Sequence, residues 1–65
     1  MSRIVDFYFK HKSNKYTTLY VEFSNGHIAT EDCRVLERRR NYCILEDNGP
    51  LFTRLKEASY PRKDR

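Results

Sequence analysis

Three adjacent arginines, Arg38-Arg39-Arg40, are the residues of this chain whose type and spacing are best suited to chemistry. Guanidinium groups are planar, permanently charged and rich in hydrogen-bond donors, so they bind phosphate and carboxylate groups well. Three in a row repel one another and cannot all be buried, so the fold must expose them to solvent or to an anionic partner. Apolar residues flank the triplet on both sides, and we therefore expect the fold to hold it in a fixed place.

The remaining residues that catalyse reactions or bind metals in other proteins form no known motif here. Cys33 and Cys43 are separated by nine residues, which matches no zinc-ligand pattern, and His11 and His27 do not complete one. The sequence has no glycine-rich phosphate loop, no His-x-x-x-His motif and no serine-nucleophile motif. A chain this short also has little volume for a pocket of ~300 Å³ or more. We expect a protein without enzymatic activity, cofactor, metal ion or small-molecule substrate.

Length and composition predict one small basic domain. The chain has 65 residues, a net charge of +4, and five Tyr and four Phe to build a core. No stretch predicts a signal peptide or a transmembrane segment, so we expect a cytoplasmic protein, away from membranes, whose two cysteines are reduced and fill small apolar positions. We assign residues 1–59 to the domain and residues 60–65 to a basic, mobile tail.

Alternating apolar residues predict two N-terminal strands, over residues 3–10 and 16–24. After them, Asn25-Gly26 predicts a two-residue type I′ turn leading into a third strand, with Phe23 opposite Ile28. One face of this meander should carry the apolar side chains and be buried: Val5, Phe7, Phe9, Leu19, Val21, Phe23 and Ile28. The opposite face should then carry Tyr8, Tyr20 and Lys10, together with Tyr16.

The second half of the chain admits two interpretations. In the first, residues 30–40 are a strand, a tight turn passes through residues 39–41, and a further strand follows at 42–47. Residues 51–56 are then a last strand or a short helix begun by Pro50. The fold is then mainly β, with about five antiparallel strands in an SH3-like or Sm-like small barrel or meander. In the second, an α+β fold has a three-stranded sheet, a short helix at about 31–40 and a second helix at about 50–58, begun by Pro50.

Two segments resemble a known family. Val21-Glu-Phe-Ser-Asn-Gly, followed by Asn41-Tyr-Cys-Ile-Leu-Glu-Asp, resembles the strand–Asn-Gly–strand and Asn-x-x-x-Leu-Glu-Asp layout of Sm-like RNA-binding barrels. The resemblance covers less than half of the chain. This sequence lacks the glycine that the family places in the middle of a strand. Its residues 3–10 predict a strand where the family has a helix. The resemblance favours a small barrel, and it implies that Asn41 helps to hold a base.

Two functional hypotheses fit these features. The first is a regulatory or accessory module that binds nucleic acid, RNA or single strands rather than duplex DNA. The second is an adaptor or inhibitor, of the sort that small viral and mobile-element genomes encode, that docks on a larger enzyme. A homodimer seam at the tyrosines is a further alternative. Both main hypotheses use the same candidate residues: Arg38, Arg39, Arg40, Tyr8, Tyr20, Lys10 and Asn41.

Overall fold

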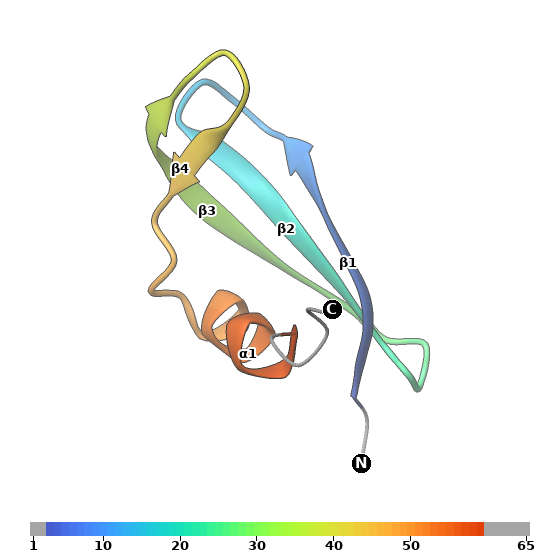
Figure 1. Cartoon of the computed structure of the whole chain (residues 1–65). Coiled ribbons are helices and arrows are strands. Elements are labelled where there is room, and N and C mark those ends of the chain that lie inside the picture. Colours follow the sequence, from blue (N-terminus) through green and yellow to red (C-terminus); the bar gives the residue numbers. More distant parts are fainter. Residues whose placement is uncertain (1–2, 60–65) are drawn as a thin grey trace.

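A computed structural model describes residues 3–59 of the chain (Figure 1). The fold consists of a four-stranded antiparallel sheet and one helix. The strands neighbour one another in chain order, and the sheet curls around the helix. This architecture confirms a mainly β small domain, whereas the predicted tail at 60–65 lies outside the described residues. The elements are β1 (Ile4–His11), β2 (Tyr16–Phe23), β3 (Ile28–Arg38), β4 (Cys43–Leu45) and α1 (Pro50–Ser59).

The two interpretations of the second half are each right for one segment. Residues 30–40 belong mostly to β3, which pairs with β2 from Ile28 to Arg34 and then with β4, so the helix expected at 31–40 is wrong. The helix expected at about 50–58 is present as α1, with Pro50 in its first turn, where a missing N–H costs nothing. The sheet accordingly has four strands rather than about five.

The β2–β3 hairpin forms at the predicted place but with a longer loop. Phe23 pairs with His27, because its N–H donates to the His27 carbonyl at 2.9 Å, and its carbonyl accepts from Gly26 N–H at 2.9 Å. Gly26 has a φ of 90°. Three-residue hairpin loops end in a residue with such a positive φ, usually a glycine, which forms a bulge. The extra loop residue shifts the register by one, so Ile28 pairs with Glu22 instead of Phe23 and lies on the exposed face.

The core lies between α1 and the sheet, on what we call the inner face. The central strand β2 contributes Leu19, Val21 and Phe23, and Cys33 and Leu55 complete the buried set. Phe7 packs against this cluster as predicted. Three residues expected in the core are largely exposed instead: Val5 (54%), Phe9 (40%) and Ile28 (49%).

These exposed residues have separate causes. The β1–β2 register shifts between Ile4 and Asp6, so Val5 has no partner and turns outward. Phe9 lies on the inner face, opposite Leu19, where its ring touches Phe52 near the start of α1 but stays 40% exposed. A ten-residue helix is about 15 Å long, whereas an eight-residue strand spans about 27 Å. One end of the inner face therefore stays open.

A carboxylate from the sheet fixes the start of α1. Glu31 projects from the inner face of β3, and its two carboxylate oxygens accept hydrogen bonds from the N–H groups of Leu51 and Phe52, both at 3.0 Å. Gly49 leaves space for this contact, since a Cβ there would overlap the Glu31 carboxylate. The helix dipole and two otherwise unpaired N–H groups thus receive a negative charge from a residue about twenty positions away.

Candidate anion-binding site at one end of the sheet

The β1–β2 and β3–β4 turns lie at the same end of the sheet (Figure 1). A hydrogen bond of 2.7 Å from Val35 N–H to the Lys15 carbonyl joins the two regions. We call this part of the molecule the basic end, because most of the lysines and arginines among the described residues gather there. They are Lys10, Lys12, Lys15, Arg34, Arg38, Arg39 and Arg40.

Acidic partners neutralise only part of this charge. Lys12 bonds Asp32, and that hydrogen bond raises the pKa of Lys12 and lowers the pKa of Asp32. Arg39 forms an ion pair with Glu37. Within residues 3–59, no ion-pair partner is found for Lys15, Arg34 or Arg40. Their charges are therefore available to an anionic ligand.

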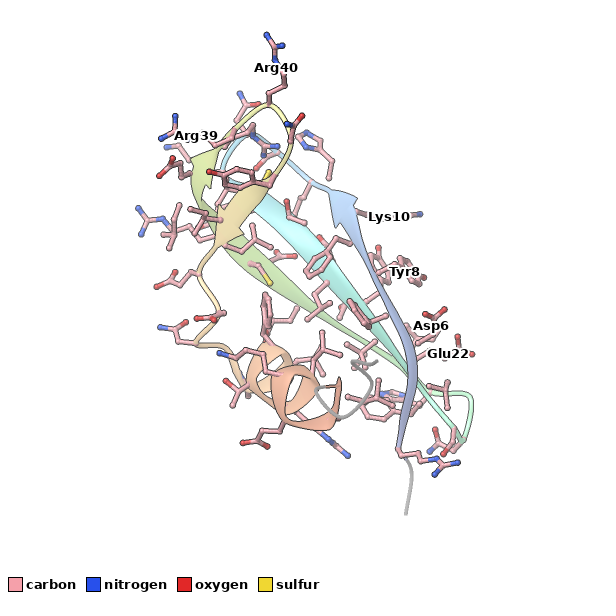
Figure 2. All side chains as sticks on the ribbon, viewed as in Figure 1. Asp6, Tyr8, Lys10, Glu22, Arg39 and Arg40 are labelled. Carbon is pink, nitrogen blue, oxygen red and sulfur yellow. The ribbon has the colours of Figure 1, made fainter. Side chains whose placement is uncertain are left out.

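The three adjacent arginines point in different directions. β3 has an irregularity at Leu36, between Val35 and Glu37, which changes the alternation of its side chains. Arg38 is thereby placed opposite Cys43, on the inner side, where its Nη1 lies 3.4 Å from the Cys43 Sγ. Arg39 turns toward Glu37, and Arg40 projects beyond the tip of the hairpin (Figure 2). Asn41 follows it in the same exposed turn.

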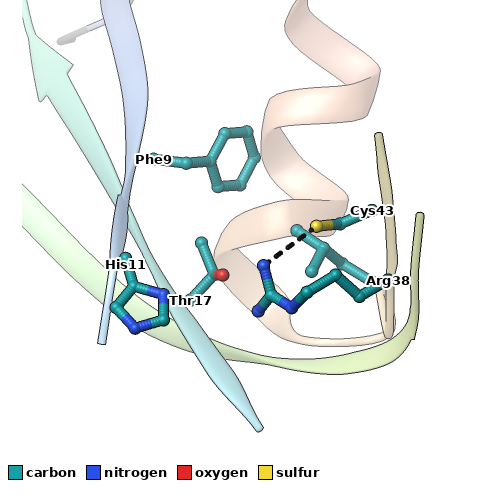
Figure 3. A pocket seen from close by; sticks show the side chains of 6 residues that line it. Phe9, His11, Thr17, Arg38 and Cys43 are labelled. Carbon is teal, nitrogen blue, oxygen red and sulfur yellow. Dashed lines mark hydrogen bonds between the residues drawn. The ribbon is translucent and has the colours of Figure 1, made fainter. Parts of the chain in front are cut away.

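A cavity of about 350 Å³ opens at the uncovered end of the inner face (Figure 3). This volume exceeds what the chain length led us to expect. The guanidinium of Arg38 and the ring of Phe9 both border it. Its lining residues are Phe9, His11, Thr17, Arg38, Cys43 and Leu45.

The predicted tyrosines lie elsewhere, on the outer face of the sheet. Tyr8 and Tyr20 are cross-strand partners whose rings stack on each other, with centroids 4.9 Å apart and planes 7° from parallel. The Lys10 ammonium lies 5.8 Å from the Tyr20 ring. Further along this face, Asp6 and Glu22 form an acidic pair (Figure 2). The structure thus brings Tyr8, Tyr20 and Lys10 together but separates the tyrosines from the arginine turn.

Two other tyrosines accompany the arginines. Tyr16, 42% exposed, pairs with Arg34. Tyr42, 58% exposed, closes the turn, because its backbone carbonyl accepts a 2.8 Å hydrogen bond from Arg39 N–H. The sequence could have indicated Tyr42 as a site residue, because it lies two positions after Arg40. It could not have indicated Arg34 and Tyr16 as a pair, because they are neighbours only through the strand register.

The two cysteines occupy different environments. Cys33 is 3% exposed, and burial raises the pKa of its thiol, as expected for a small apolar position. Cys43 is also a free thiol but is exposed, so the same expectation is wrong for it, because β4 is an edge strand that α1 does not cover. Residues 3–59 contain no group of three or more potential metal ligands. In the same range, no helix has the length and apolarity needed to cross a bilayer.

Comparisons of the whole chain with protein-family models, with curated proteins and with solved structures found no match. The resemblance to Sm-like barrels therefore remains limited to the two sequence segments that suggested it. The candidate site must be interpreted from its own residues.

Proposed function

We propose that this protein is a small, non-enzymatic accessory module that binds nucleic acid at its basic end, preferring RNA or other single strands to duplex DNA. The observation that carries the proposal is that three cations at the basic end, Lys15, Arg34 and Arg40, have no ion-pair partner within residues 3–59. Exposed tyrosines lie near them, since Tyr16 pairs with Arg34 and Tyr42 follows Arg40 in the same turn. Cations that contact phosphates and aromatic rings that stack on bases are the two components of single-strand binding sites.

The distribution of charge supports one ligand-binding end. The acidic pair Asp6–Glu22 lies away from the basic end, whereas Asp32 and Glu37 lie at that end but bond Lys12 and Arg39. Duplex recognition through a groove usually requires a free helix or ribbon. Here α1 is ten residues long and buries Leu55 against the sheet, which favours single strands.

Binding of a labelled oligonucleotide, followed by fluorescence anisotropy at several salt concentrations, tests this proposal. For single strands, each lost phosphate contact reduces the log–log salt slope by about 0.7. The combined change of Lys15, Arg34 and Arg40 to Gln should therefore flatten the slope by about 2 if each cation contacts one phosphate. Arg3→Gln, at the opposite end of β1, is the matched control and should leave the slope unchanged.

Equal binding by the triple variant and by the parent would refute the proposal. Preference for duplex over single-stranded DNA would refute its second part. Circular dichroism of each variant shows whether the fold is retained, and exposed charges of this kind contribute little to stability.

A protein-interaction module is the second candidate, and the exposed apolar residues of the β3–β4 hairpin favour it. Leu36 is 54% exposed and Ile44 is 42% exposed, on the same hairpin as Tyr42. Affinity capture of the tagged chain with and without nuclease separates the candidates. A stoichiometric protein that survives nuclease and is lost on Leu36→Ser would support the second. Sedimentation of the purified chain tests for the homodimer.

A further inference from the structure

We infer that the cavity at the open end of the inner face holds one unstacked nucleotide of the bound strand, with its base against Phe9 and its phosphate on Arg38. This inference rests on the proposed function and deepens it, because it assigns one nucleotide to a defined place. The cavity has a volume of about 350 Å³, at the lower end of the ~300–1,000 Å³ typical of sites for small ligands.

Arg38 supplies the anion-binding group. The contact found for its guanidinium within residues 3–59 is to the Cys43 thiol, which is a weak hydrogen-bond acceptor. Most of its five N–H donors are thus open to a stronger acceptor. Among residues 3–59, no carboxylate lines the cavity, so an entering phosphate meets the Arg38 cation without a competing acid from this part of the chain.

Phe9 supplies the aromatic wall. Its ring is 40% exposed although its strand position faces inward. Contacts with Phe7, at 6.3 Å between centroids, and with Phe52, at 5.9 Å, hold the ring in place from other directions. A fixed ring loses little entropy when a base stacks on it, and such a stack is tolerant of base identity.

The remaining lining residues complete a site with mixed chemistry. Leu45 adds apolar surface, while the Thr17 hydroxyl and the His11 imidazole are able to hydrogen-bond the edge of a base or a sugar hydroxyl (Figure 3). An apolar wall, one guanidinium and a few polar groups match a nucleotide better than they match inorganic phosphate, which has no apolar part, or an uncharged apolar ligand.

Cys43 provides a direct measurement, because it lines the cavity and is exposed, whereas Cys33 is 3% exposed. The experiment measures the rate at which iodoacetamide alkylates Cys43, with the alkylated site identified by mass spectrometry. The rate is compared between the protein without ligand and the protein with uridine monophosphate, uridine, inorganic phosphate or an oligouridylate. We expect the monophosphate and the oligouridylate to slow alkylation several-fold, and uridine or phosphate to have much weaker effects.

Two variants test the assigned roles in oligouridylate binding. Phe9→Leu keeps the apolar bulk but removes the stacking ring, and we expect affinity to fall roughly 5- to 150-fold. Arg38→Lys keeps the charge but removes the planar donors, and we expect a loss on the order of tenfold. Arg3→Lys is the matched control, because Arg3 precedes β1 at the opposite end of the sheet, and little change is expected. Circular dichroism shows whether each variant is folded. If Phe9→Leu unfolds, the Arg38→Lys result and the alkylation rates decide.

The outcomes distinguish this inference from the proposed function. An oligouridylate that binds by anisotropy, is weakened by the Lys15, Arg34 and Arg40 changes, and leaves Cys43 alkylation unaltered would support the function and overturn the cavity assignment. An oligouridylate that does not bind at all would overturn the function. In that case, the lack of protection by the monophosphate would overturn the cavity assignment as well.

Discussion

Replacing Glu31 with Ala should remove a large part of the stability of this domain, although Glu31 is a charged residue on a strand. Its carboxylate accepts two N–H groups at the start of α1, at 3.0 Å each. Loss of a helix cap costs ~1 kcal/mol, up to ~2, and loss of a partly buried charge at a helix N-terminus costs a further ~0.3–1 kcal/mol, up to ~2. The expected total is ~2–3 kcal/mol.

That loss is large for a chain of 65 residues. Domains of this size are stable by only a few kcal/mol, and 1 kcal/mol shifts Tm by ~4–8 °C. Urea unfolding followed by circular dichroism gives the free energy of unfolding, and thermal melts give the shift. Glu22→Ala is the matched control, since Glu22 lies on the outer face of β2, opposite to the face that packs against α1. It should change stability by less than ~0.5 kcal/mol.

Gly49 turns this prediction into a double-mutant cycle. Gly49→Ala places a methyl group where the Glu31 carboxylate lies, so in the parent it should cost about as much as losing the cap. In the Glu31→Ala background the overlap is gone, and the same change should cost well under ~1 kcal/mol, the difference between Ala and Gly as a cap residue. Equal costs of Gly49→Ala in the two backgrounds would refute the capping argument, as would equal effects of Glu31→Ala and Glu22→Ala.

Two further predictions concern stability. Asp32 and Asp47 each bond a lysine, and that hydrogen bond holds the pKa of the carboxyl group below its ordinary value. Each ion pair therefore adds to the free energy of unfolding above the unfolded-state pKa of ~3.9. This added stability is lost as pH falls through the lower folded-state pKa. Urea midpoints from pH 7 to pH 2 should show a decline that the double change to Asn makes shallower, and an unchanged decline would contradict this assignment. Phe23→Ala should cost ~3–5 kcal/mol because its ring is buried, whereas Ile28→Ala should cost under ~1 kcal/mol; equal urea midpoints for the two variants would show that the register is wrong.

Local patterns in the sequence were sufficient for several elements. Alternation placed Phe7, Leu19, Val21 and Phe23 on the inner face, because adjacent side chains on a strand point to opposite faces. Asn25-Gly26 located the hairpin, because Gly26 adopts the positive φ that its turn requires. Pro50 marked the start of α1, because its fixed φ suits the first turn of a helix.

Local sequence patterns did not predict the strand register or the bulges, and these determine which residues meet in the candidate site. The irregularity at Leu36 turns Arg38 toward the cavity and away from Arg39 and Arg40, although the three are adjacent in sequence. A bulge adds one residue to one strand and reverses every later side chain, and its position depends on the partner strand. The cavity and the capping carboxylate of Glu31 depend likewise on the seating of α1.

The sequence by itself thus determined that the chain is a small, basic, mainly β domain that exposes an arginine turn, because charge, alternation and turn chemistry are local properties. The tertiary structure alone decided which cations and rings meet. It placed Arg34 beside Tyr16, set the β1–β2 turn against β3, and left the end of the inner face near Phe9 open. Those contacts join residues distant in the chain, and their pairing is fixed by strand register and by the length of one helix.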